Sequence, residues 1–131
     1  MANQITAINA YRPKIKLGRT AGNDELVEFI ARSTGLNESG VRQVLLELRD
    51  AVISFNRQGR AVKLEGLGIY TPSIDLDGVI KVGHRADTAV KSALNSSGDF
   101  RGEILNRDAI GQSSDDLIAR WNTDHPNDLV A

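Results

Sequence analysis

The sequence predicts an α+β fold in which two helices precede a three-stranded antiparallel sheet, followed by a short closing helix. Apolar residues recur at steps of three and four between residues 23 and 58, the period of amphipathic helices. After Gly59 the period changes to two, and Asp77-Gly78 marks a hairpin between apolar runs. The 131 residues include no cysteine, so an ordinary core must hold the fold without disulfides or thiolate metal sites.

Residues 1–20 are expected to form an extended arm or strand. Apolar and polar residues roughly alternate through Ile5 and Ile8, and Ile15 and Leu17 alternate with lysines after Pro13. Such alternation predicts a strand that lies on another surface, interrupted at the proline.

Two helices follow, and the second has more apolar surface than its neighbour can cover. Asn23 is the predicted N-cap of a short helix ending near Gly35, and Asn37 opens a longer one that stops at Gly59. The apolar positions of the longer helix are Val41, Val44, Leu45, Leu48, Val52 and Phe55, broadened by Leu46, Ala51 and Ile53. A helix with two apolar faces needs two partners, so the sequence predicts a homodimer.

The sheet is expected to begin where Val62 and Leu64 alternate with charged residues. Gly66-Leu67-Gly68 turns the chain, and Pro72 excludes a central-strand position. Asp77-Gly78 predicts a two-residue hairpin loop. The last strand then leads into a helix from about Ala86 to Leu94.

Ser96-Ser97-Gly98 is a flexible joint that divides a main domain, residues 21–95, from a C-terminal extension, residues 96–131. The extension predicts one strand within residues 100–105 and one helix that starts at a Ser113/Asp116 capping box. One strand and one helix cannot make an independent core. The extension must therefore pack on the main domain, on residues 1–20, or on a partner.

The formal net charge of -1 conceals an uneven distribution. Residues 1–20 carry four bases and no acid, residues 21–57 have a net charge of -2, residues 58–95 of +1, and residues 96–131 of -4. The net charge argues against a protein that covers nucleic acid non-specifically. The basic N-terminal segment nevertheless means that a nucleic-acid-binding surface is not excluded.

Several blocks of the chain, in order from residue 24 to 95, resemble the bacterial HU and IHF histone-like DNA-binding proteins. The block Gly59-Arg60-Ala61-Val62-Lys63-Leu64-Glu65-Gly66-Leu67-Gly68-Ile69-Tyr70 is similar to the strand pair of that family, and residues 83–95 are similar to its closing segment. Residues 96–131 resemble the extension of divergent, short-armed HU-like proteins of bacteroidetes. The resemblance therefore also allows the extension to lead to a further, immunoglobulin-like domain. The resemblance implies an HU/IHF-like fold and a homodimer that binds double-stranded DNA.

The chain departs from that family where sharp DNA bending would be expected. Its arm is short and has Asp75 and Asp77 near the tip, and Pro72 is not in the place of the family's wedging proline. His84, Asp87 and Thr88 replace the usual Phe, Gly and Lys. The resemblance therefore implies binding to the duplex backbone with low sequence specificity and with weak or no sharp bending.

The predicted phosphate contacts are bases of the sheet and the closing helix, which would neutralise phosphates and release counterions. They are Arg60, Lys63, Lys81, Arg85 and Lys91, and a possible DNA arm adds Arg12, Lys14, Lys16 and Arg19. The alternative for the first set is the solvated face of an amphipathic sheet, and for the second it is solubility alone.

No grouping of residues predicts an enzyme, a cofactor, a metal site or a small-molecule substrate. His84 and His125 lack ligand spacing, and Asp115-Asp116 fits the charge expected at a helix N-terminus. No apolar run predicts a membrane span, so the expected location is cytoplasmic, at the nucleoid. The competing hypothesis is a dimeric protein-interaction module that keeps the HU fold but has lost DNA binding, with the acidic extension as a docking or masking element.

Overall fold

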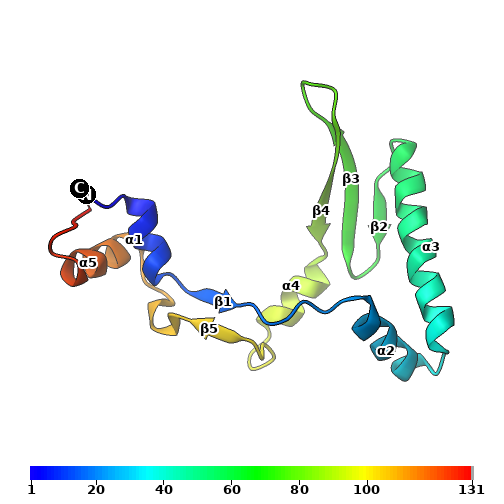
Figure 1. Cartoon of the computed structure of the whole chain (residues 1–131), viewed down its shortest axis with the longest axis horizontal. Helices are drawn as coiled ribbons and strands as arrows, with labels where there is room; N and C mark the ends of the chain where they lie inside the picture. Colours follow the sequence, from blue (N-terminus) through cyan, green and yellow to red (C-terminus); the bar gives the residue numbers. More distant parts are fainter. Residues whose placement is uncertain (131) are drawn as a thin grey trace. The chain divides into compact units, whose positions relative to one another are not determined.

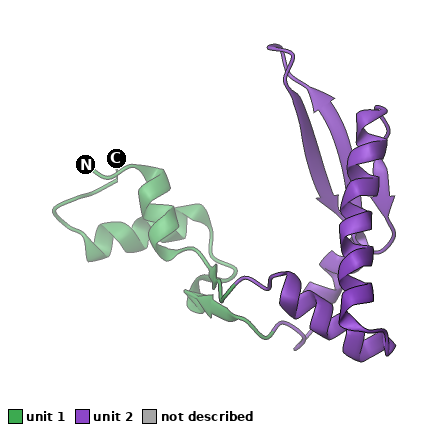
Figure 2. Cartoon of the chain, turned by 45° about the vertical axis from the view of Figure 1, so that its right-hand side comes forward, with its two compact units in different colours: residues 1–19, 101–131 green, residues 20–100 purple. Residues whose placement is uncertain are grey.

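The computed structural model describes residues 1–130 and confirms an α+β protein. Within these residues there are five α-helices and two antiparallel sheets (Figure 1). The chain forms two compact units: unit 1 comprises residues 1–19 and 101–131, and unit 2 comprises residues 20–100 (Figure 2). Each unit is described by itself.

Unit 2 begins with the two predicted helices, α2 (Asn23–Thr34) and α3 (Glu38–Arg57). Asn37 caps α3 as predicted, its side chain accepting the Gly40 amide at 2.7 Å. The prediction for α2 was one residue off, because Gly22 occupies the N-cap position and Asn23 is the first helical residue. The helices pack on each other, and an Arg42–Asp24 ion pair of 2.8 Å joins them.

The three-stranded sheet of unit 2 has the order β2–β3–β4, formed by β2 (Val62–Leu64), β3 (Gly68–Ile74) and β4 (Ile80–Ala86). Helix α3 packs against β2 and β3. Asn56, near the end of α3, links the helix to the sheet. Its side-chain amide donates to the Arg60 carbonyl at 2.8 Å and to the Tyr70 carbonyl of β3 at 3.3 Å. The closing helix α4 (Thr88–Asn95) starts two residues later than predicted, because Ala86 still pairs in the sheet and Asp87 is the N-cap.

The β3–β4 hairpin differs from the prediction in its loop and in the place of Pro72. The Gly78 amide donates to the Asp75 carbonyl at 3.1 Å, Gly78 has a φ of 82°, and the Asp75 amide donates to the Val79 carbonyl at 3.1 Å. These bonds define a three-residue loop with a glycine bulge. Pro72 lies in β3, the central strand, but β2 ends before this level, so β3 has only β4 as a neighbour there.

Unit 1 corrects the expectation of an extended N-terminal segment. Residues Gln4–Tyr11 form helix α1, and only Lys14–Lys16 form a strand, β1. The Asn3 side chain caps the helix by accepting the Thr6 amide at 2.7 Å, and Ala7 is fully buried. The three-residue step from Ile5 to Ile8 is helical in period, and the helix stops before Pro13 because a residue that precedes proline disfavours the helical conformation.

The C-terminal extension packs on this N-terminal segment, one of the three places that the sequence left open. Strand β5 (Glu103–Leu105) pairs antiparallel with β1, and α5 (Ser114–Asp124) packs against α1. A short 3-10 helix, Arg107–Ala109, lies between them in sequence. The predicted Ser113/Asp116 capping box starts α5.

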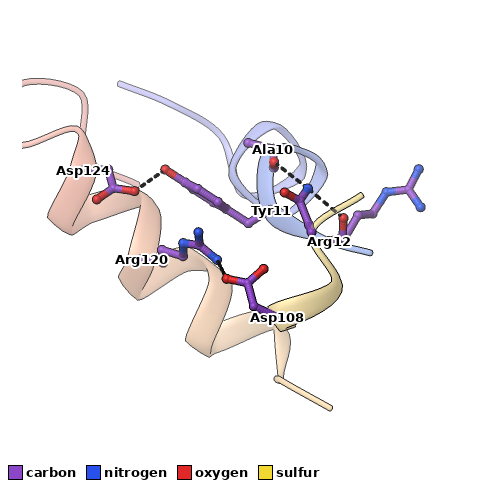
Figure 3. A network of polar contacts seen from close by, with 7 residues as sticks. Ala10, Tyr11, Arg12, Asp108, Arg120 and Asp124 are labelled. Carbon is purple, nitrogen blue, oxygen red and sulfur yellow. Dashed lines mark hydrogen bonds and ion pairs between the residues drawn. The ribbon is translucent and has the colours of Figure 1, made fainter. Parts of the chain in front are cut away.

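A polar network joins α1 to the extension (Figure 3). The Tyr11 hydroxyl donates to Asp124 at 2.6 Å, and the Arg120 guanidinium lies 4.5 Å from the centre of the Tyr11 ring and 3.0 Å from the Asp108 carboxylate. Asn106 donates its side-chain amide to the carbonyls of residues 10 and 12. The hydrogen bond to the Asp124 carboxylate raises the pKa of Tyr11 above 10.0.

Candidate nucleic-acid interface

The register of the β2–β3–β4 sheet sorts its side chains into a basic face and an apolar face. Lys63 and Arg85 both pair with Ile69, so these three residues form one row across the sheet. Because successive side chains of a strand point to opposite faces, Lys81 shares the face of Arg85. The opposite face carries Val62, Leu64, Tyr70, Pro72, Ile74, Ile80, Val82 and His84.

Three of the five predicted sheet and helix bases meet at one hollow of about 440 Å³. Lys63 of β2, Arg85 of β4 and Lys91 of α4 line it, together with Gly68, Ile69, Ala86, Asp87 and Thr88. All three bases are exposed, and within residues 1–130 no ion pair joins any of them to a carboxylate. Three cations therefore face one concave surface without an internal counter-ion partner.

The backbone around the hollow fixes how these cations are presented. Gly68 is buried with a φ of 155°, and a Cβ there would lie 2.4 Å from the Arg85 carbonyl oxygen and 2.6 Å from His84 Nε2. The glycine thus permits the close approach of β3 and β4. The Asp87 amide donates to the Leu67 carbonyl at 2.9 Å, and the Asp87 carboxylate accepts the Ala89 amide at 2.8 Å, so the first turn of α4 is held at the rim.

A second, shallower hollow of about 380 Å³ shares Ile69 and Arg85 with the first. Thr71 and Gly83 also line it, and a Cβ added to Gly83 would meet nothing within 4 Å. The two hollows adjoin each other along this face of the sheet. We call this surface, lined by Lys63, Ile69, Thr71, Gly83, Arg85, Thr88 and Lys91, the basic track.

The other two predicted bases lie outside the basic track. Lys81 forms an ion pair of 3.4 Å with Asp75, and the Arg60 guanidinium lies 4.9 Å from the centre of the Phe55 ring. At the arm tip, the hydrogen bond from the Val79 amide to Asp75, with further bonds from the Asp77 amide and Lys81, lowers the pKa of Asp75 below 3.8. The Asp75 carboxylate is thus held by groups of its own hairpin.

A family model described as an HU domain fused to a wHTH, Ig or glycine-rich motif matches residues 3–96, well over half of the chain. The chain belongs to this HU-domain family. The matched region begins about twenty residues before the first block that resembles HU in the sequence, so α1 and β1 fall inside it. No curated protein matches the chain.

The bases expected to form a DNA arm lie in unit 1 of this HU-family chain, and some of them have internal partners. Lys16 lies 3.7 Å from Glu103 across the β1–β5 pair, and the Arg12 Nε donates to the Asn9 side chain at 2.9 Å. Lys14 sits on β1 opposite Leu105, and Arg19 is the last residue of this part of unit 1.

The sequence does not predict that small residues line the basic track. Thr88 begins α4 at the larger hollow, and Gly83 lines the shallower one. An Asp before Thr-Ala-Val is a recognisable N-cap pattern, and it could have placed the start of α4 correctly.

Other kinds of site find little support in the part of the chain that the structure describes. In residues 1–130, no three His, Asp or Glu side chains cluster so that they could hold a metal ion. Among the helices of the same region, none has the length and apolar character needed to cross a membrane.

Proposed function

We propose that this HU-family chain is a non-enzymatic protein that binds the backbone of double-stranded DNA as a homodimer. The observation that carries the proposal is the basic track, in which three exposed cations on three secondary-structure elements line one concave surface. Contacts of this kind neutralise phosphates and carry little sequence information, so the proposed binding has low sequence specificity. Lys81 and Arg60 extend the proposed contact set toward the arm and the end of α3.

The bases of the N-terminal segment are proposed to contribute less to DNA binding than those of unit 2. Lys16 already has a carboxylate partner, and unit 1 combines the four N-terminal bases with the acidic residues of the extension. We therefore place the main DNA contact on unit 2.

The dimer is proposed from apolar surface that unit 2 leaves uncovered. Within the described residues, Val27 and Val41 are the only buried apolar side chains of unit 2, while Val44, Ile80 and Val82 are 63%, 68% and 59% exposed. A hollow of about 370 Å³ between α3 and the sheet is lined by apolar side chains, including Leu45, Leu48, Val52, Leu64, Tyr70 and Val82. A second copy presents the same apolar surface and would cover it in an isologous contact.

The short arm supports weak or no sharp bending, as expected of a short-armed member of the family. Its loop apex is Leu76, which is fully exposed, and Asp75 and Asp77 flank it. The same apex favours the second candidate function, a dimeric protein-interaction module, because an apolar tip between two carboxylates suits a protein surface better than phosphate.

A fluorescence-anisotropy titration of a labelled random-sequence duplex at about 50 and 200 mM salt tests the proposal. We expect binding at the lower salt, with an affinity that falls steeply at the higher salt and changes little with sequence. Absence of binding at about 50 mM salt would refute the DNA-binding proposal and favour the interaction module.

A further inference from the structure

The hollow at the base of the basic track has a charge balance that a single backbone phosphate does not match. Its three cations, Lys63, Arg85 and Lys91, have one acid among them, Asp87. The Asp87 carboxylate is engaged by the first turn of α4, but its charge still counts toward the field. The net charge of the lining residues is therefore +2, whereas a phosphodiester carries -1.

The size of the hollow is also sufficient for a small ligand. About 440 Å³ lies within the range of small-molecule sites. The hollow combines cations with the Ile69 side chain and with Thr88, which begins an eight-residue helix. Converging cations favour a compact anion with several free oxygens, because each cation can donate a charge-assisted hydrogen bond.

We propose that this hollow binds a phosphomonoester dianion in preference to a phosphodiester. A phosphomonoester has three terminal oxygens and a charge close to -2 at neutral pH, which equals the net charge of the lining with opposite sign. Lys63, Arg85 and Lys91 supply the charge, and Thr88 supplies a hydroxyl at the start of α4. Such a group occurs at the 5′ end of a DNA strand, as at a nick, and in a free mononucleotide.

For a DNA end, the inference rests on the proposed function and makes the protein a binder of phosphorylated breaks as well as of intact duplex. The test uses the full-length protein and three labelled duplexes of identical sequence: intact, nicked with a 5′-phosphate, and nicked with a 5′-hydroxyl. We expect the phosphorylated nick to bind at least about two- to fivefold tighter than the hydroxyl nick. That range is the effect of one exposed charge pair, and the 5′-phosphate adds close to two negative charges.

Acidification provides an internal check, because the second pKa of a phosphomonoester is about 6. Between pH 7.5 and pH 5.5 the ratio of the two nick affinities should fall, because most of the phosphate loses its second negative charge and keeps the first. A ratio that stays the same on acidification would contradict recognition of the dianion.

Two variants that each remove one positive charge test whether the preference for the phosphorylated nick arises at this hollow. Lys91→Gln removes a cation of the hollow, and Arg32→Gln removes one from α2, where Arg32 pairs with Glu28. We expect the first variant to lose the preference for the phosphorylated nick and the second to keep it. Loss in both or in neither would contradict the assignment to this hollow.

A free deoxynucleoside 5′-monophosphate, titrated against the protein by NMR with the nucleoside as control, identifies the source of the group. Saturable shifts at residues of the hollow would extend the site to free nucleotides, and their absence beside a preference for the phosphorylated nick would assign it to DNA ends. Equal binding of all three duplexes, with no nucleotide binding, would overturn the inference while leaving the proposed function intact. Failure to bind any duplex would overturn the proposed function instead.

Discussion

The two sets of candidate DNA-contacting bases, one in each unit, differ in the partners that they have within the chain. In unit 1 a basic N-terminal segment and an acidic extension satisfy each other, through the Lys16–Glu103 pair, the Tyr11–Asp124 hydrogen bond and a 3.4 Å contact between the N-terminal amine and Asp128. In unit 2 the three bases of the basic track have no carboxylate partner among the described residues, and the apolar face of the same sheet is only partly covered by α3. Charge that is partnered within the chain stabilises a fold, and charge that has no internal partner is available for a ligand.

The largest expected effect on stability comes from adding a side chain at Gly68, where β3 and β4 approach each other closely beside the basic track. Gly68→Val should lower the free energy of unfolding of unit 2 by about 3 kcal/mol or more, because a side chain there overlaps the Arg85 carbonyl and forces a strained φ. Urea unfolding followed by circular dichroism measures the change.

Gly83→Ala is the matched control, since its Cβ would enter open space. It should change the free energy of unfolding by no more than about 0.5 kcal/mol. Equal effects of the two substitutions would contradict the close approach of β3 and β4 at Gly68.

A charge placed on the apolar face should separate the two protomers. Leu48→Glu puts a carboxylate in the hollow between α3 and the sheet, and the desolvation cost should weaken the dimer by about 2 kcal/mol or more. Leu129→Glu, in unit 1, is the control, because Leu129 is already 48% exposed in a unit to which no dimer contact is assigned. Sedimentation at micromolar concentration should show a shift toward the monomer mass only for the first variant. A wild-type protein that is monomeric under these conditions would refute the dimer.

Removing one internal partner should loosen unit 1 and leave unit 2 unchanged. Tyr11→Phe deletes the hydrogen bond to Asp124, so the unfolding midpoint of unit 1 should fall by a few degrees. Trp121, the one tryptophan of the sequence, lies 6.4 Å from the Tyr11 ring, centre to centre, and its fluorescence reports on unit 1.

The same contact gives a pH dependence of known sign. Because the pKa of Tyr11 is raised in the folded state, the contribution of the Tyr11–Asp124 hydrogen bond to stability is complete below pH 10.0. It is lost as the pH rises through the higher folded-state pKa.

Tyr70→Phe, in unit 2, is the control for Tyr11→Phe and should leave the unfolding midpoint reported by Trp121 unchanged. If Tyr70→Phe moved that midpoint as far as Tyr11→Phe does, the Trp121 fluorescence would not be specific to unit 1.

The smallest expected effect is local to the arm tip. The pKa of Asp75 lies below 3.8, so the loop gains stability above that pH and loses it as the pH falls through the lower folded-state value. An NMR titration should show the Asp77 and Val79 amides shifting with a common midpoint below pH 3.8. A midpoint above that value would mean that the amides do not hold the Asp75 carboxylate in its charged form.

Local patterns in the sequence were sufficient to predict most of unit 2 and the start of α5 in unit 1, and non-local pairing explains what they missed. Asn37, the period of α3 and the Ser113/Asp116 capping box act within a few residues, and each gave the correct element. Helix α1 was missed because its buried residue, Ala7, carries no strong apolar signal, and its packing partner α5 lies about a hundred residues away.

The candidate site was predicted in its residues but not in its grouping. The sequence names all five bases, but only the sheet register places Lys63 beside Arg85, and the start of α4 brings Lys91 to the same hollow. Lys81 lies apart from them and pairs with Asp75. Register depends on the turn at Gly66–Gly68 and on the bulged hairpin loop, whose length the dipeptide Asp77-Gly78 did not specify.

The central claim is that the basic track of unit 2, and not the bases of unit 1, contacts DNA. Two triple variants test it, each removing three positive charges: Lys63→Gln/Arg85→Gln/Lys91→Gln and Arg12→Gln/Lys14→Gln/Lys16→Gln. The measurement is the slope of log affinity against log salt for one duplex. The account predicts that the first variant reduces the magnitude of the slope by about 5, six contacts per dimer at about 0.9 each, while the second changes it by less than about 1. A wild-type slope in the first variant, or a larger loss in the second, would contradict it.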